Sequence, residues 1–290
     1  MNGQVGWELQ RSLVLLGEVK ACSRQTVDLE DFDSLALLVQ DYRPNIIVNA
    51  VAYTAVDKAE SDADLSRTIN ATVVGLLARE IKKLNGWLIH YSTDYVFDGG
   101  KSGKYTEEDN TNPLSVYGKT KLQGETLIVN SGCKYLIFRT SWVYAGRGRN
   151  FIKTILSLGK QRDELNVVSD QRGVPTSAEL IADTTAYCLC LIKKNNFLSR
   201  DAIGVYNLVP DGQTTWYHFA KFIISEASRL GYKLRLDCSN VNPIMTHEYP
   251  VPAKRPFNSS LDTDKLASTF GINMPDWKLH AIRAIEEIVI

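Results

Sequence analysis

A tyrosine and a lysine lie four residues apart in the segment YGKTK, as Tyr117 and Lys121. On a helix this spacing places both side chains on one face, one turn apart. An ammonium group beside a phenol favours the phenolate and lowers the tyrosine pKa from about 10 toward working pH. The pair therefore predicts acid catalysis on a carbonyl oxygen while hydride arrives at the carbon, with Lys121 also holding a nicotinamide ribose.

The surroundings of Tyr117 separate it from a chance match. With 13 tyrosines, roughly one Tyr-x-x-x-Lys is expected at random, and a second one begins at Tyr217. Tyr217 lies on a predicted helix beyond the βαβ region, so we interpret it as a packing or surface residue. Tyr117 instead follows the apolar run WLIHY and the turn Ser92-Thr93-Asp94. Ligands bind at such strand ends in open α/β sheets, and Thr93 could hydrogen-bond the same carbonyl.

Apolar runs of strand length alternate with helical stretches over the first half of the chain. The predicted strands are residues 45–50, 87–91 and 135–139, and the helices between them are 65–84 and 119–129. Strands that are apolar on both faces are typical of a parallel sheet covered by helices. The βαβα order predicts the α/β class, with a doubly wound parallel sheet of the Rossmann type.

The pattern loosens after about residue 145 into turn-rich and proline-rich pieces, although helices are still predicted at 178–193 and 217–230. We expect an NAD(P)-binding domain over residues 1–145. Residues 146–290 then form a smaller, mixed C-terminal part that binds substrate, with some segments returning to the cofactor domain.

A glycine turn at the chain start resembles half of a dinucleotide-binding turn. Gly3-Gln4-Val5-Gly6 leads into a helical stretch, where glycines let the backbone approach a pyrophosphate. No strand precedes it, so we expect the first strand of such a sheet to be missing, which leaves ladder groups of its neighbours unpaired. Ser23 and Arg24 stand where a second strand should end, and they suit a 2′-phosphate better than an acidic residue would. This favours NADPH, with NADH as the alternative.

Composition excludes several classes of protein. Lys plus Arg and Asp plus Glu are equal at 33 each, so no overall field draws the chain to nucleic acid or an anionic membrane. The longest early apolar run, residues 13–16, is too short to span a bilayer. The five cysteines lack the spacing of a zinc site, and we interpret them as reduced thiols of a cytoplasmic protein.

Six blocks, in order from about residue 44 to the end, carry a more specific resemblance. They are VNAVAYTAVDKAE, HYSTDYVFDG, VYGKTKLQGE, FRTSWVYAGRGRNF, SDQRGVPT and PVPAKRPFNSSLDT. Together they resemble the signature blocks of the dTDP-4-dehydrorhamnose reductases, which are extended short-chain dehydrogenases. The resemblance implies NADPH-dependent reduction of the C4 keto group of dTDP-4-dehydro-β-L-rhamnose, for dTDP-rhamnose and cell-surface polysaccharide (O-antigen) synthesis.

The resemblance also implies roles for individual residues. Thr93, Tyr117 and Lys121 correspond to the catalytic triad, and Asp94 and Trp142 to contacts with the sugar nucleotide. Arg255, in the proline-rich stretch, is a candidate clamp for the pyrophosphate. The expected cofactor contacts, Ser23 and Arg24 included, are Gly3, Gln4, Val5, Asp28, Leu29, Ala52, Tyr53, Thr54 and Tyr91, together with Tyr117 and Lys121.

Magnesium and a homodimer are implied by the same resemblance, through carboxylates at a subunit interface. The matching positions are Glu8, Glu179 and Glu287. The four histidines receive no such role, because none has a partner at ligand spacing; we interpret His90, in an apolar strand, as a satisfied core residue.

Two other functions stay open at this point. The regulatory subunit of methionine adenosyltransferase is similar in fold and keeps a YGKTK-like block, so a related chain can act as a binding partner. A sugar-nucleotide epimerase or dehydratase would use the same tyrosine and lysine with a tightly held, recycled NAD. The block around Trp142 and the residues beside Thr93 favour the reductase over both.

Overall fold

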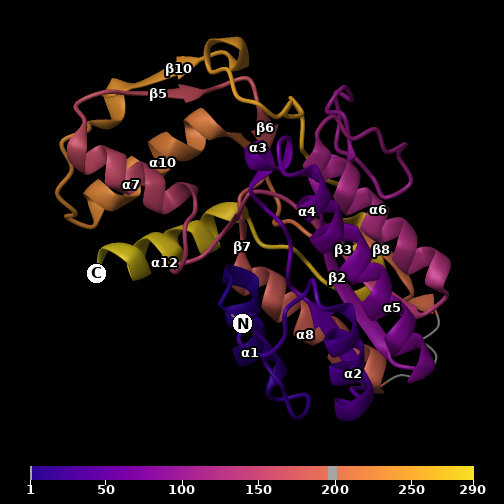
Figure 1. Ribbon diagram of the computed structural model, residues 1–290. Helices are drawn as coiled ribbons and strands as arrows, with labels where there is room; N and C mark the ends of the chain where they lie inside the picture. Colours follow the sequence, from indigo (N-terminus) through magenta and orange to yellow (C-terminus); the bar gives the residue numbers. More distant parts are fainter. Residues whose placement is uncertain (1, 195–200) are drawn as a thin grey trace.

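A four-stranded parallel sheet forms the centre of the larger part of the protein (Figure 1). The computed structural model describes residues 2–194 and 201–290. The strands are β1 (Ile46–Asn49), β2 (Trp87–Thr93), β3 (Lys134–Thr140) and β8 (Gly204–Asn207), in the order β1-β2-β3-β8. The prediction of a parallel, Rossmann-like α/β sheet is confirmed, and its three predicted strands are β1, β2 and β3.

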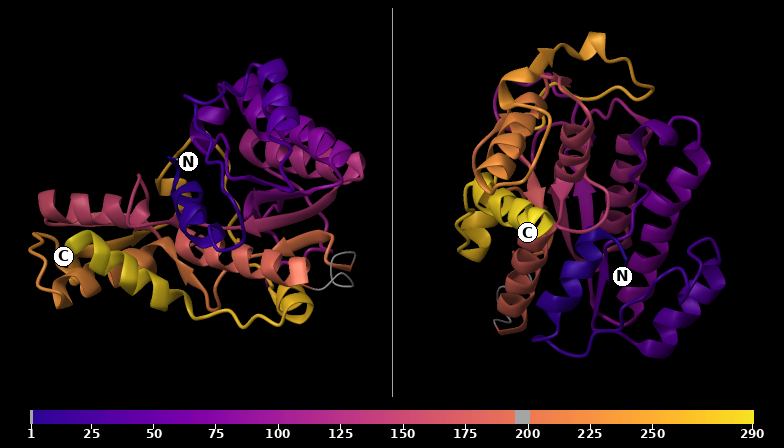
Figure 2. Two further views of the ribbon diagram at one scale, coloured as in Figure 1. Left: turned by 90° about the horizontal axis from the view of Figure 1, so that it is seen from below. Right: turned by 90° about the vertical axis from the view of Figure 1, so that its left-hand side faces the viewer.

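Helices cover both faces of the sheet because the strand residues alternate between two apolar clusters. Leu88 of β2 packs with α2 (Phe32–Tyr42), α5 (Val73–Lys83) and α6 (Val116–Ser131). Ile89 packs with α1 (Gln4–Leu13), α8 (Ala178–Lys194) and α11 (Asp264–Phe270) on the other face. Figure 2 shows the sheet between these helix layers.

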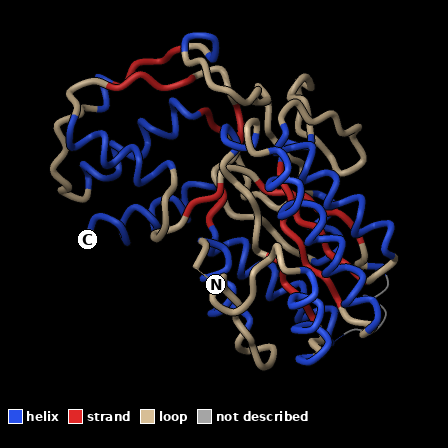
Figure 3. The backbone as a smooth tube through the Cα atoms, viewed as in Figure 1, coloured by secondary structure: helices blue, strands red, loops and turns tan. Residues whose placement is uncertain are grey.

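A second apolar core organises the C-terminal part, which lies on the left of Figure 1. Its helices are α7 (Phe151–Gln161), α10 (Trp216–Arg229) and α12 (Trp277–Val289), and the parallel pair β5 (Leu165–Val168) and β10 (Val241–Ile244) covers them. Two short ladders connect it to the sheet: β4 (Val143–Tyr144) with β7 (Thr176–Ser177), and β6 (Arg172–Gly173) with β9 (Thr214–Thr215). Figure 3 shows these paired strands apart from the main sheet.

Short helices complete the described chain. Between β1 and α5 come α3 (Val56–Ala59), α4 (Ala63–Arg67) and a π-helical turn, η1 (Thr68–Thr72). The 3₁₀ turns are η2 (Asp94–Val96), η3 (Cys238–Asn240) and η4 (Thr246–Glu248). None of the described helices combines the length and apolarity that crossing a membrane requires.

The segment between α1 and α2 differs from the prediction. Residues 14–31 form turns and loop, so no strand ends at Ser23 and Arg24 as predicted. The reason is visible in the sheet: β1 is an edge strand, and no described strand lies beside its outer edge to pair with this segment. Parallel strands persist only when their ladder groups find partners.

Candidate active site

The carboxyl end of β2 delivers Thr93 and Asp94 to the side of the sheet where α6 begins. Thr93 is extended and caps η2, accepting a hydrogen bond from the Tyr95 N–H at 3.1 Å. Its hydroxyl donates to Asp94 Oδ1 at 2.9 Å. Both side chains are buried, so their orientation is fixed by the core rather than by solvent.

Helix α6 presents Tyr117 and Lys121 one turn apart, as the spacing predicted. Ser115 begins the helix by accepting from the Gly118 N–H at 3.2 Å. Gly118 lies directly against the Tyr95 carbonyl, where a Cβ atom would collide, so only glycine lets α6 approach η2 this closely. The approach brings the Tyr117 hydroxyl into hydrogen bonding with Thr93.

The electrostatics of Tyr117 differ from the prediction. Burial raises the pKa of the phenol to about 12, against a lowering effect of the Thr93 hydrogen bond, and the charge of Asp94 raises it further. The predicted lowering by Lys121 is wrong in this geometry. Its ammonium nitrogen is directed instead at the Tyr91 carbonyl, 2.5 Å away, and at the His90 ring. Tyr117 therefore holds its proton as an acid.

Lys121 lies in the core with 1% of its surface exposed. Burial lowers its pKa to about 8, and the charge of Glu125, one turn along α6, opposes this. Glu125 is itself paired with Arg139 of β3 at 2.7 Å and accepts from Ser92 of β2. The lysine therefore lies beside a balanced ion pair rather than a free carboxylate.

His90 is the residue that the sequence interpretation missed. It is fully buried, as a core histidine should be, but its Nε2 lies 3.2 Å from the Lys121 Nζ and its Nδ1 lies 3.2 Å from the Asn49 amide nitrogen. One feature of the sequence could have indicated this contact. His90 comes directly before Tyr91, and side chains alternate along a strand, so the two side chains point to opposite faces of the sheet. A search for ligands at metal spacing could not detect this contact.

Asp94 combines burial with an incomplete set of hydrogen bonds. Burial raises the pKa of this carboxyl to about 6, while hydrogen bonds from Ser259 and Thr93 act in the opposite direction. Its Oδ2 has no partner within the described part of the chain. An unpartnered buried oxygen beside Thr93 suits a hydroxyl donor, which a sugar ring provides.

Trp142 stands in a strained position close to the site. Its φ is +45°, a left-handed value that bulky residues rarely adopt, and such strain gathers at ligand-binding positions. The indole stacks on Trp216 of α10 with ring centroids 3.6 Å apart and lies against Gly173 of β6. Trp216 thus packs on the residue predicted to contact the sugar nucleotide.

Arg255 reaches the first part of the chain through an ion pair. Its Nη2 lies 2.7 Å from Asp57 of α3, and its buried Nε has no partner among the described residues. The predicted clamp is therefore occupied on one side by a carboxylate. The buried Nε–H is one of the donors still available to an acceptor.

The predicted phosphate contacts lie at the start of α1. Gly3 caps this helix without a side-chain hydrogen bond, and the space beside its Cα is open. The first N–H groups of a helix are unpaired donors, so this end suits a phosphate. Gln4 accepts from Asn150 at 2.9 Å, and Val5 packs against the cluster on the α8 face.

The segment after β1 brings the next group of predicted contacts toward the same edge. Ala52, Tyr53 and Thr54 form no regular structure there. Asn70, in the π-helical turn, accepts from the Tyr53 N–H at 2.8 Å and donates to Thr120 of α6 at 3.1 Å. Tyr91 presents its carbonyl to Lys121, whereas its hydroxyl is bonded to Thr185 of α8.

The residues predicted on the adenine side are held by local turns. Ser23 accepts from the Gln25 N–H at 3.2 Å, and Asp28 from the Glu30 N–H at 3.0 Å. Arg24 is exposed, and Leu29 packs partly against the α2–α5 cluster. No contact between this group and the catalytic residues appears in the described part of the chain.

The three glutamates predicted to bind magnesium do not form a site within one chain. Glu179 is bonded to His280 and Arg283, and Glu8 pairs with Arg11 at 3.3 Å. Glu287 lies against Gly146. Over residues 2–194 and 201–290, no three His, Cys, Asp or Glu side chains gather at metal-binding distance. The magnesium prediction gains no support.

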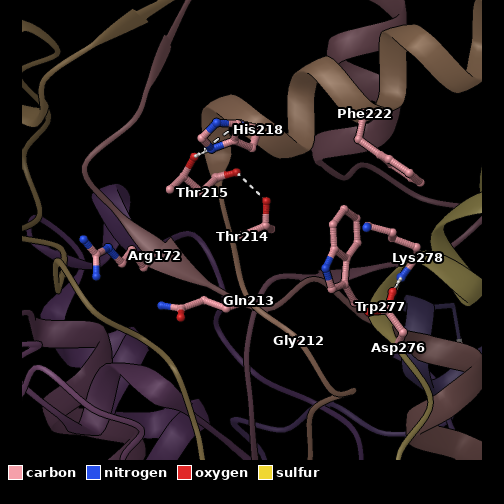
Figure 4. A pocket seen from close by; sticks show the side chains of 10 residues that line it. All are labelled: Arg172, Gly212, Gln213, Thr214, Thr215, His218, Phe222, Asp276, Trp277 and Lys278. Atoms are coloured by element: carbon pink, nitrogen blue, oxygen red, sulfur yellow. Dashed lines mark hydrogen bonds between the residues drawn. The ribbon is translucent and has the colours of Figure 1, made fainter.

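A cavity of about 530 Å³ lies between the amino ends of α10 and α12 (Figure 4). Thr215 and Asp276, which cap these helices, lie on its wall. Arg172 also lines it, and adjacent Gly173 contacts Trp142 on the other face of β6. None of these residues was a predicted site residue. The other lining residues are Gly212, Gln213, Thr214, His218, Phe222, Trp277 and Lys278.

Comparison with known proteins finds matches over nearly the whole chain. The family described as RmlD substrate binding domain matches residues 1–290. A relative from Escherichia coli (strain K12), named dTDP-4-dehydrorhamnose reductase, is 47% identical over 291 residues, which cover 99% of this chain and 95% of the relative.

Solved structures agree with the sequence comparison. A dTDP-4-dehydrorhamnose reductase from Clostridium acetobutylicum superposes with a TM-score of 0.90 at 36% identity, covering 100% of this chain and 97% of that one. The Bacillus anthracis enzyme, solved in complex with NADP, gives a TM-score of 0.85 at 33% identity, covering 99% and 95%.

Proposed function

The chain belongs to the family of dTDP-4-dehydrorhamnose reductases, and we propose that it reduces the C4 keto group of dTDP-4-dehydro-β-L-rhamnose to give dTDP-β-L-rhamnose. The observation that carries the proposal is the meeting of Thr93, Tyr117 and Lys121 at the carboxyl end of β2. A product of this kind serves the synthesis of cell-surface polysaccharides.

In this mechanism Tyr117 is the general acid. Its phenol keeps its proton because burial raises its pKa to about 12, so the proton is available when negative charge develops on the C4 oxygen. Thr93 would orient that oxygen by turning its hydroxyl proton to it from Asp94 Oδ1, where the hydroxyl donates in this structure. Proton donation then makes the alkoxide a hydroxyl, and the resulting phenolate regains a proton from solvent.

The residues at the start of α1 fit a dinucleotide. The open space at Gly3 and the uncapped N–H groups accept a phosphate, Lys121 would hold the nicotinamide ribose, and Arg24 would pair with a 2′-phosphate. When bound, the cofactor supplies the hydride. We assign NADPH, which agrees with the NADP bound to the Bacillus anthracis relative.

Substrate recognition falls to the residues between the two parts of the chain. Asp94 Oδ2 would accept a hydrogen bond from a sugar hydroxyl, and Trp142 would cover the sugar ring. Arg255 would bind the pyrophosphate through its free Nε–H. Residues 1–145 would then serve as the cofactor-binding domain and residues 146–290 as the substrate-binding part, and we place the enzyme in the cytoplasm as a homodimer.

The test is the rate of NADPH oxidation in the presence of dTDP-4-dehydrorhamnose, followed by absorbance, with identification of the product. We expect dTDP-rhamnose to form in proportion to NADPH consumed, and no nicotinamide to copurify with the chain. Copurified NAD with no net oxidation would instead favour an epimerase or dehydratase.

A further inference from the structure

Trp142 has a backbone conformation that a tryptophan adopts only under constraint. Its φ of +45° lies in the left-handed region, where a bulky side chain is strained. Two hydrogen bonds to the segment after β6 hold the backbone there. The Ser141 hydroxyl donates to the Val174 carbonyl at 2.7 Å, and the Trp142 carbonyl accepts from the Thr176 N–H at 3.3 Å. The surrounding fold therefore imposes the strain.

The indole of Trp142 is enclosed on both faces. Trp216 stacks on one face, with ring centroids 3.6 Å apart and 13° between the ring planes. A Cβ atom added to Gly173 would lie 2.6 Å from Cε2, 2.7 Å from Cζ2 and 3.0 Å from Nε1 of the indole. Cε2 is bonded to the other two atoms and is the nearest, so Gly173 lies over the plane of the ring. Trp216 occupies one face, so Gly173 covers the other, and the ring lies in a slot between them.

The two walls of this indole slot are connected through the β6–β9 ladder. Gly173 pairs with Thr214 of β9, and Trp216 comes two residues later as the first residue of α10. The side chain of Thr215 caps this helix, and Phe151 of α7 packs against Trp216 with ring centroids 4.6 Å apart. The spacing of the walls is therefore set by the backbone of the ladder and by the start of α10.

The identity of residue 173 agrees with this arrangement. Gly173 does not have a left-handed φ, so its backbone conformation would accept another residue. The ring of Trp142 excludes one, because any Cβ atom would collide with it. A glycine is thus required at this position by the slot.

We infer that Trp216 and Gly173 are positioning residues that hold Trp142 in the strained conformation in which it meets the sugar of the substrate. A slot between two flat walls lets the ring slide in its own plane but does not let it turn. Without one wall the ring can turn and the backbone can relax from its left-handed φ. Only a fraction of the molecules then keeps Trp142 in place, and the apparent affinity for the sugar falls by that fraction.

The slot deepens the proposed function and rests on it for its purpose, because that function gives Trp142 a sugar to contact. The test compares the binding of dTDP-rhamnose and of dTDP by calorimetry, since only the first ligand carries the sugar. Trp216→Leu should weaken dTDP-rhamnose binding about tenfold, if about one molecule in ten keeps Trp142 in place. The binding of dTDP should not change.

Two outcomes of this comparison would overturn the role of the slot. Equal weakening of both ligands would show a general disturbance of the substrate-binding part, and unchanged binding of dTDP-rhamnose would show that Trp142 needs no wall. Trp216→Phe keeps a flat aromatic wall and should regain most of the affinity for dTDP-rhamnose. A phenylalanine that binds no better than leucine would contradict stacking as the cause.

Gly173→Ala removes the space on the other side of the slot and leaves Trp216 intact. A Cβ atom 2.6 Å from the indole forces the ring to move, so dTDP-rhamnose binding should again weaken about tenfold and dTDP binding should not. Gly204→Ala is the matched control, because a Cβ atom on this strand glycine would lie 3.5 Å from Tyr206, an ordinary contact. Equal effects of the two alanines would refute the slot.

Trp277→Leu is the control for Trp216→Leu. Trp277 is also the first residue of a helix in the same core, but it packs on Phe219 and Phe222. Its loss should lower stability without changing the ratio of the two affinities. A change of this ratio equal to that in Trp216→Leu would assign the effect to the core as a whole.

Fluorine-19 NMR of the chain labelled with 5-fluorotryptophan tests the slot without any ligand. Trp142→Phe identifies the Trp142 signal among those of the five tryptophans. We expect this signal to be single and narrow in the natural chain and in Trp277→Leu, and to broaden or split in Trp216→Leu because the ring turns. A single, narrow signal in Trp216→Leu would refute the slot. If the natural chain neither binds nor turns over a dTDP sugar, the proposed function fails, whereas this measurement still decides whether Trp216 holds the ring.

Discussion

The proposed catalytic centre and the segment proposed to bind the adenine side of the cofactor are built in opposite ways. Thr93, Asp94 and Lys121 are each less than one-tenth exposed and are fixed by the junction of β2 with α6. Ser23 and Arg24 lie instead in a turn between α1 and α2, held by hydrogen bonds to neighbours in sequence. The proposed catalytic residues are thus fixed by the core, whereas the proposed contacts with the far end of the cofactor are held only by local hydrogen bonds. Substitutions that each change only one property, namely the reaction rate, the stability of the fold or the binding of the cofactor, test this contrast.

The largest effect on rate is expected from Tyr117→Phe. Loss of the acid should lower kcat by about 10²–10⁴-fold, with little change in stability because the ring remains packed. The measurement is steady-state NADPH oxidation, with urea unfolding beside it. Tyr217→Phe is the matched control, because it alters the other Tyr-x-x-x-Lys and should leave kcat unchanged. Normal turnover by Tyr117→Phe would remove it from the mechanism.

Substitutions in the core of the catalytic region should lower the free energy of unfolding the most. Arg139→Leu leaves Glu125 buried without its partner, which typically costs about 3–5 kcal/mol of unfolding free energy. Arg235→Leu is the control, since its pair with Asp163 is exposed and should be worth at most about 1 kcal/mol. Urea unfolding of both variants decides this, and equal losses would contradict the contrast.

Asp94 should make stability depend on pH. Burial raises its pKa from 3.8 to about 6, so between these values the folded chain binds more protons than the unfolded chain. This contribution is complete below about pH 4 and is lost as the pH rises through about 6, a change of about 3 kcal/mol. Asp94→Asn should abolish this loss of stability. The measurement is the free energy of unfolding by urea, compared between about pH 4 and about pH 7. An unchanged profile in the variant would assign the dependence to other groups.

The smallest effect is expected at the recognition segment. Arg24→Ala should raise KM for NADPH about tenfold, because one charge-assisted hydrogen bond to a 2′-phosphate is lost. KM for NADH, kcat and the free energy of unfolding should stay unchanged, since Arg24 packs against nothing in the core. An equal rise in KM for NADPH and for NADH would show that Arg24 does not bind the 2′-phosphate.

Much of the fold and the catalytic pair could be predicted because their signals are local. Apolar runs such as WLIHY predict buried parallel strands, and the spacing of Tyr117 and Lys121 has one meaning once a helix is assumed. The position after a strand then directs both residues to the carboxyl edge of the sheet, and the structure brings them there.

The features that could not be predicted from the sequence depend on contacts between residues that are far apart along the chain. The contact of His90 with Asn49 appears only when the register of β1 and β2 places the two residues side by side. The absence of a strand near Ser23 depends on which strands lie beside β1, a property of the whole sheet. The pKa of Tyr117 follows from burial, which no spacing of residues records.

The stacked pair of Trp142 and Trp216 also gives the molecule an optical signature. Two indoles with centroids 3.6 Å apart couple their electronic transitions, and such coupling gives paired bands of opposite sign in circular dichroism. A sugar ring that slides Trp142 away from its partner would weaken these bands without any added label. The proposed sugar contact at Trp142 would therefore make this stacked pair a spectroscopic reporter of substrate entry.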